Sequence, residues 1–157
     1  MIQRIQTVYL AIVLVFLTII SLGVSIFNFH AGEMVFRVNV MGVQQMNETS
    51  ENINLLSLPF YVGAILLMIV CFFALILFKN LKTQLAVARF AAMFYFVVLV
   101  FVGFGAFLGK YFTDQDKVTI SLGFGFYLLV LGFPLMLLAV RSINKDKKLI
   151  DSVNRLR

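Results

Sequence analysis

The side chains that could carry out acid–base, nucleophilic or metal chemistry are few and scattered along this chain. The only histidine, His30, and the only cysteine, Cys71, have no second base, nucleophile or ligand at a spacing typical of a catalytic pair or metal site. No ionisable residue lies in the middle of an apolar run, where a coupled transporter would carry its relay. The acidic residues between these runs are equally dispersed: Glu33, Glu48, Glu51, Asp114 and Asp116. We therefore expect no enzymatic activity, no cofactor and no metal site.

The composition indicates a membrane protein. Of the 157 residues, 62% are hydrophobic and only 13% are charged, and the mean hydropathy is +1.01. A water-soluble domain of this size could not bury so much apolar surface, whereas lipid can solvate it. The net charge of +6 is carried by basic residues at the ends of apolar runs. This placement favours a bilayer with anionic lipid headgroups as the partner and makes nucleic acid an unlikely one.

Four apolar runs have the length of a membrane-spanning helix, for which about 20 residues are needed. They extend over Val8–Phe27, Leu58–Phe78, Val87–Leu108 and Val118–Val140. The first run does not have the features of a cleaved signal peptide, because it is too long and no small-residue cleavage site follows it. We therefore predict an all-α membrane protein, formed by one four-helix transmembrane bundle over residues 1–157.

The distribution of lysine and arginine predicts the orientation of this bundle. Ten basic residues fall on one side: Arg4, Lys79, Lys82, Arg89 and six in the C-terminal segment 141–157. Three fall on the other side: Arg37, Lys110 and Lys117. Because basic residues accumulate on the cytoplasmic side, both termini are expected there.

The loop 28–57 is then extracytoplasmic and contains a strand signal. Apolar and other residues alternate over Met34–Gly42, which predicts a half-buried strand. Gln44–Asn54 is predicted to be a polar connection, and Ser57 with Pro59 forms a plausible start of the second helix.

Small residues in the third and fourth runs predict close helix packing. Gly105 and Gly109 form a G-x-x-x-G pair, and Ser121, Gly125 and Gly132 fall within about 40° of one another on a helical wheel. The short connection Gly109–Lys117 makes these helices neighbours, so we expect the two sets to face each other; an oligomer contact is the alternative. Pro134 is expected to kink the fourth helix.

The C-terminal segment 141–157 predicts a basic amphipathic helix. Its apolar residues Ile143, Leu149, Ile150, Val153 and Leu156 span about 140° of a helical wheel, with Lys145, Lys148 and Arg155 opposite. Asp146 and Arg157 interrupt the apolar arc. Such a helix either lies on the inner leaflet or docks to a cytoplasmic protein. The residues expected to contact lipid or a partner are Arg4, Lys145, Lys148, Leu149, Ile150, Val153, Arg155, Leu156 and Arg157.

The opening MIQRIQTVYL and the closing KDKKLIDSVNRLR resemble the four-span inner-membrane proteins of Bacteroidota grouped as domain-of-unknown-function family 4293. The similar positions are Met1–Gln6, Lys145–Leu149, Ser152 and Arg155–Arg157, whereas Asp151 and Asn154 depart from the pattern. The resemblance implies a bacterial inner membrane and supplies no activity, substrate or cofactor.

These observations favour a non-catalytic accessory or scaffold subunit of a membrane complex, acting through its basic cytoplasmic face. The alternative is a small transporter or channel component that transports only as an oligomer.

Overall fold

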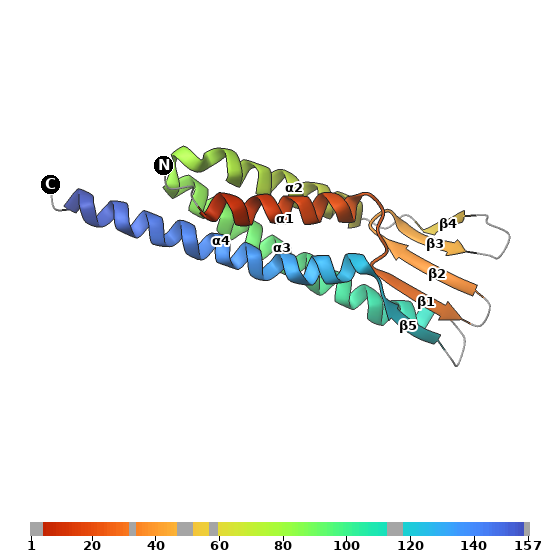
Figure 1. Ribbon diagram of the computed structural model, residues 1–157. Helices are drawn as coiled ribbons and strands as arrows, with labels where there is room; N and C mark the ends of the chain where they lie inside the picture. The colour runs from red at the N-terminus through yellow and green to blue at the C-terminus, as the bar shows by residue number, and fades with distance from the viewer. Residues whose placement is uncertain (1–4, 32–33, 47–51, 57–59, 113–117, 156–157) are drawn as a thin grey trace.

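The computed structural model describes residues 5–31, 34–46, 52–56, 60–112 and 118–155, and it is predominantly helical (Figure 1). Its helices are α1 (Ile5–Ser21), α2 (Phe60–Ile76), α3 (Leu81–Phe112) and α4 (Phe124–Arg155). A short 3-10 helix, η1 (Leu77–Lys79), follows α2, and the chain then turns at Asn80 into α3. Both ends of the chain lie at one end of the molecule (Figure 1).

The four helices pack side by side in a ring. α1 contacts α2 and α4, and α3 also contacts α2 and α4. On α1 the buried residues Gln6, Leu10, Val13, Leu17 and Ile20 recur alternately every four and three positions, which is the spacing of a helix–helix seam. Apolar residues of the described helices therefore form a continuous core.

The outer surface of the helices is also apolar. Phe72, Phe90 and Phe101 are all more than half exposed, at 54%, 56% and 60%. Three helical segments, Tyr61–Lys79, Leu81–Gly105 and Phe124–Ser152, are long and apolar enough to cross a membrane, and α1 is a shorter apolar helix. Such an exterior suits contact with lipid tails.

A five-stranded antiparallel sheet lies at the end of the molecule opposite the termini (Figure 1). It comprises β1 (Phe27–Ala31), β2 (Met34–Asn39), β3 (Gly42–Met46), β4 (Asn52–Leu56) and β5 (Val118–Leu122), in the order β4-β3-β2-β1-β5. The strand preceding α4 thus pairs with the strand following α1, with Asn28 opposite Ser121.

The β2–β3 turn follows from its residue types. The Oδ1 atom of Asn39 accepts hydrogen bonds from the backbone N–H groups of Met41 (3.0 Å) and Gly42 (2.9 Å). Gly42 has φ +148°, a value that favours glycine. Asparagine commonly closes tight turns in this way, and the strand predicted over Met34–Gly42 is confirmed over Met34–Asn39.

The structure corrects several predicted boundaries. Val118–Leu122 is a strand, so the fourth helix begins at Phe124 rather than at Val118. The helix predicted over Val8–Phe27 ends at Ser21, since Gly23 (φ +92°) follows and Phe27 begins β1. Gln44–Asn54, predicted as a connection, contributes residues to β3 and β4. At Phe27 and over Val118–Leu122, the pairing of β1 with β5 supplies the backbone hydrogen bonds that a helix would otherwise supply.

Candidate functional site: the basic extension of α4

The C-terminal part of α4 extends beyond the other helices as a single projecting helix (Figure 1). Ile143 is fully buried, whereas Leu149 and Ile150, about two turns further on, are 57% and 46% exposed. We call residues 144–155 the α4 extension. The prediction that the C-terminal segment is helical is confirmed as far as Arg155, and the helix continues unbroken through Pro134. Arg4, Leu156 and Arg157 lie outside the described residues.

The α4 extension continues the seam through which α4 packs into the bundle. Met136, Ala139 and Ile143 are fully buried and follow one another at intervals of three and four residues. If these intervals of three and four residues are continued along α4, the next positions are Asp146, Ile150 and Val153. Because the other helices end before this level, the seam continues past the bundle (Figure 1).

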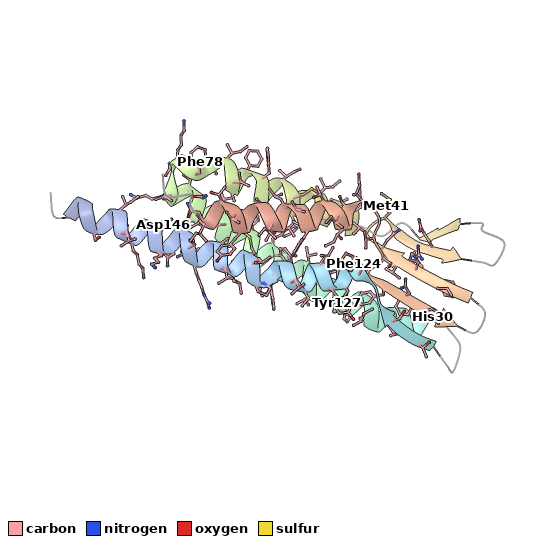
Figure 2. The ribbon with its side chains drawn as sticks, viewed as in Figure 1. His30, Met41, Phe78, Phe124, Tyr127 and Asp146 are labelled. Atoms are coloured by element: carbon pink, nitrogen blue, oxygen red, sulfur yellow. The ribbon has the colours of Figure 1, made fainter. Side chains whose placement is uncertain are left out.

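The seam of the α4 extension is flanked by positive charge. Lys145 and Lys148 are exposed, Lys147 is partly exposed, and Asp146, labelled in Figure 2, is partly buried at its seam position. The hydroxyl of Ser152 donates a hydrogen bond to the carbonyl of Leu149 (2.7 Å), which turns this side chain back onto the helix. The extension therefore presents one apolar stripe with a single acidic residue, with Lys145 and Lys147 on either side of the stripe and Lys148 on the opposite side of the helix.

The small residues of α4 are positions of close packing, but with neighbours that the sequence did not predict. A Cβ atom at Gly132 would meet the hydroxyl of Tyr95 on α3, and one at Gly125 would lie 3.0 Å from the carbonyl oxygen of Ser25. Ser121 is in β5 rather than in the fourth helix. Among the described residues, the atoms nearest to a Cβ at Gly125 and Gly132 belong to Ser25 and Tyr95, and α3 and α4 pack together; that Gly105 and Gly109 face this side of α4 stays a prediction.

Two buried glutamines at the terminal end of the bundle were not predicted as special positions. The amide of Gln84 on α3 donates a hydrogen bond to the carbonyl of Ala74 on α2 (3.1 Å), and its Oε1 has no partner. Gln6 is fully buried, and neither of its amide atoms has a partner. The signal for Gln6 was available in the sequence, since this polar residue precedes Leu10, Val13 and Leu17 in the same seam.

Replacing Gln6 by leucine is expected to stabilise the fold. The substitution removes two buried polar groups that lack hydrogen bonds, each of which costs about 1–3 kcal/mol. We expect a rise in the unfolding temperature of the purified protein in detergent. Gln84→Leu is the matched control, because it also removes a hydrogen bond that is made, and it should give no comparable rise. A lower unfolding temperature for Gln6→Leu would contradict this account.

No group of histidine, cysteine, aspartate or glutamate in the described part of the chain could hold a metal ion. Cys71 is buried in α2, and His30 lies in β1, where its Nε2 is 3.1 Å from the Oγ of Ser121. Figure 2 shows His30 at the sheet end of the molecule, far along the bundle from Asp146.

Apolar helices of spanning length, joined to a small sheet, define a predominantly helical membrane protein. The chain belongs to the family described as Domain of unknown function (DUF4293), whose profile matches residues 2–156. The membership inferred from both ends of the sequence is thereby confirmed. No curated protein matches the chain.

Proposed function

We propose that this protein is a non-catalytic accessory or scaffold subunit of a bacterial inner-membrane complex, in which the α4 extension docks a cytoplasmic partner. The observation that carries the proposal is the continuation of the α4 packing seam, as Asp146, Ile150 and Val153, beyond the helices that cover it.

The proposed topology has four membrane-spanning helices with both termini in the cytoplasm. α1 contributes 17 residues, or about 26 Å of helix at 1.5 Å per residue, and packs along α2 and α4. The termini lie at the end of the bundle where Lys79 and Lys82 join α2 to α3, and the sheet lies at the opposite end (Figure 1). The ten-to-three distribution of basic residues supports placing the terminal end in the cytoplasm.

The direction of the α4 extension favours a protein partner over the lipid surface. From Ile143 to Arg155 the helix advances about 18 Å along the direction of α4. A helix lying on the inner leaflet would instead turn into the membrane plane. The extension projects beyond the end of the bundle, where its lysines can attract an acidic partner (Figure 1).

The partner that fits this surface is an acidic amphipathic helix. Such a helix could bury Ile150 and Val153 as α1 buries its own seam, and place carboxylates beside Lys145 and Lys147. Asp146 would then select a partner with a basic or hydrogen-bonding residue at the facing position, because a buried unpaired charge is costly.

Site-specific crosslinking in native membranes tests the proposal. A photo-crosslinking residue at position 150 should yield a defined protein adduct, whereas one at position 148, on the opposite side of the helix, should not. Ile150→Ser with Val153→Ser should reduce partner recovery roughly tenfold or more, because desolvated apolar anchors dominate interface energies. Replacing Lys145, Lys147 and Lys148 by glutamine should weaken recovery less and in a salt-dependent manner.

Three outcomes would count against the docking proposal. Adducts with lipid alone at position 150 would support a helix lying on the bilayer. Unchanged recovery in the Ile150/Val153 variant would exclude the apolar seam as the contact. Free digestion of the α4 extension by protease in wild-type membranes would show that nothing covers it, and protease access from the periplasmic side would overturn the topology.

A further inference from the structure

The two faces of the sheet have different chemistry. Phe27 and Phe29 on β1 are 4% and 3% exposed, and the Phe27 ring lies 5.4 Å from that of Phe126 at the start of α4. This apolar face attaches the sheet to the helices. Asn28 and His30 alternate with these residues along β1 and therefore belong to the opposite face.

A polar row crosses this opposite face at right angles to the strands. The strand register places Ser121 opposite Asn28, Asn28 opposite Arg37, and Arg37 opposite Gln44. These four residues come from β5, β1, β2 and β3, so at about 4.8 Å per strand the row is about 14 Å long. Arg37 is exposed and the other three side chains are partly exposed.

The hydrogen bonding of the row is incomplete at Asn28, whereas Gln44 has an interaction partner. Ser121 contacts the His30 imidazole at 3.1 Å and the backbone carbonyl of Asn28 at 3.4 Å. The side-chain Oδ1 of Asn28 is buried and has no hydrogen-bond partner. An acceptor without a partner next to an exposed guanidinium is suited to a ligand that both donates and accepts hydrogen bonds.

Within the five strands the charge is of one sign. None of the five strands contains an aspartate or glutamate, and Arg37 is their only lysine or arginine. The guanidinium of arginine binds carboxylates through two parallel hydrogen bonds. The central residue of the row is therefore suited to a carboxylate, and the amides and hydroxyl beside it to neutral polar groups.

We propose that this row, Ser121–Asn28–Arg37–Gln44, binds an acidic saccharide, with a carboxylate of the sugar on Arg37 and its hydroxyls on the flanking side chains. Hydroxyls donate and accept, as the unpaired Oδ1 of Asn28 and the neighbouring donors require. An acidic peptide fits less well, because a chain crossing the strands presents its groups at about 3.3 Å per residue rather than at the strand spacing. The topology proposed above puts this face outside the cytoplasm.

Binding of defined oligosaccharides to the full chain in detergent tests the proposal. The probes are an oligogalacturonide, its methyl ester as the uncharged counterpart, and oligoglutamate as the acidic peptide, each measured by isothermal titration calorimetry. We expect the oligogalacturonide to bind, and the ester to bind at least roughly tenfold more weakly, because it cannot form the charged pair with Arg37.

Variants separate this site from general attraction to a basic protein. Arg37→Gln should weaken oligogalacturonide binding roughly tenfold, and Arg37→Lys should lie between it and the wild type, because lysine keeps the charge but loses the paired hydrogen bonds. Arg89→Gln, an exposed arginine on α3, is the matched control and should bind normally. Unfolding temperatures establish that each variant is folded.

Equal or tighter binding of oligoglutamate would replace the saccharide by an acidic peptide and overturn the proposal. Absence of oligogalacturonide binding, or an unchanged affinity in folded Arg37→Gln, would show that the row is only the solvated face of the sheet.

Discussion

Replacing Gly123 by alanine is expected to destabilise the protein more than any other glycine-to-alanine change among the described helices and strands. Gly123 joins β5 to α4, and a Cβ atom there would overlap the backbone carbonyl oxygen of Ser25. A backbone atom cannot move aside as the end of a flexible side chain can. The expected cost is about 3 kcal/mol, at the upper end for overpacking, and about 6–12 °C in unfolding temperature.

The hydrogen bonds around Gly123 explain why the connection cannot simply shift. Its N–H donates to the carbonyl of Ile26 (2.9 Å), and the N–H of Gly125 donates to the carbonyl of Ser25 (2.9 Å). These bonds hold the start of α4 against the segment that leaves α1. Moving the segments apart to admit a methyl group would stretch both bonds.

The control for Gly123→Ala is Gly63→Ala. Gly63 is in α2, and a Cβ atom there would have no neighbour within 4 Å. Alanine favours helix over glycine by about 1 kcal/mol, so this variant should be as stable as the wild type or slightly more so. Thermal unfolding in detergent, followed by circular dichroism, compares the two. Equal unfolding temperatures would show that the contact at Ser25 does not constrain the fold.

The second large effect is expected where α3 packs against α4. Tyr95 is fully buried, its hydroxyl donates a hydrogen bond to the carbonyl of Leu129 (3.0 Å), and a Cβ atom at Gly132 would collide with that hydroxyl. Gly132→Ala should therefore cost about 1–3 kcal/mol. Gly103→Ala on α3 is the control, since a Cβ atom there would have open space around it.

A double-mutant cycle identifies Tyr95 as the cause. Tyr95→Phe alone should cost about 1 kcal/mol, because the buried hydrogen bond to Leu129 is lost. In the Tyr95→Phe protein the further cost of Gly132→Ala should be smaller, since the hydroxyl that obstructs the methyl group is absent. Strictly additive costs would contradict the packing described for Gly132.

The extension of α4 illustrates how far the sequence could predict the candidate site. The helical spacing of Ile143, Ile150 and Val153 follows from residue types alone, and the helix is confirmed there. Its relation to the bundle was not predictable, because that depends on where the other helices end. Only the structure shows Ile143 fully covered and Ile150 46% exposed on the same stripe.

The sheet, in contrast, contains structure that the sequence alone could not predict. Val118–Leu122 alternates as a strand does, yet it adjoins a long apolar run and was included in the predicted fourth helix. Its strand conformation depends on pairing with β1, whose Asn28 is more than ninety positions away from Ser121. The polar row across four strands likewise exists only after that pairing.

By itself the sequence determined that this is a helical membrane protein with a basic helical C-terminal segment, because preference for lipid and helical periodicity depend on the composition of about 20 consecutive residues. The tertiary structure decided which strand pairs with which, which side chain faces Gly132, and that Gln6 is buried without a hydrogen-bond partner. These features depend on contacts between residues far apart in the chain, and such contacts arise only when the helices close on one another.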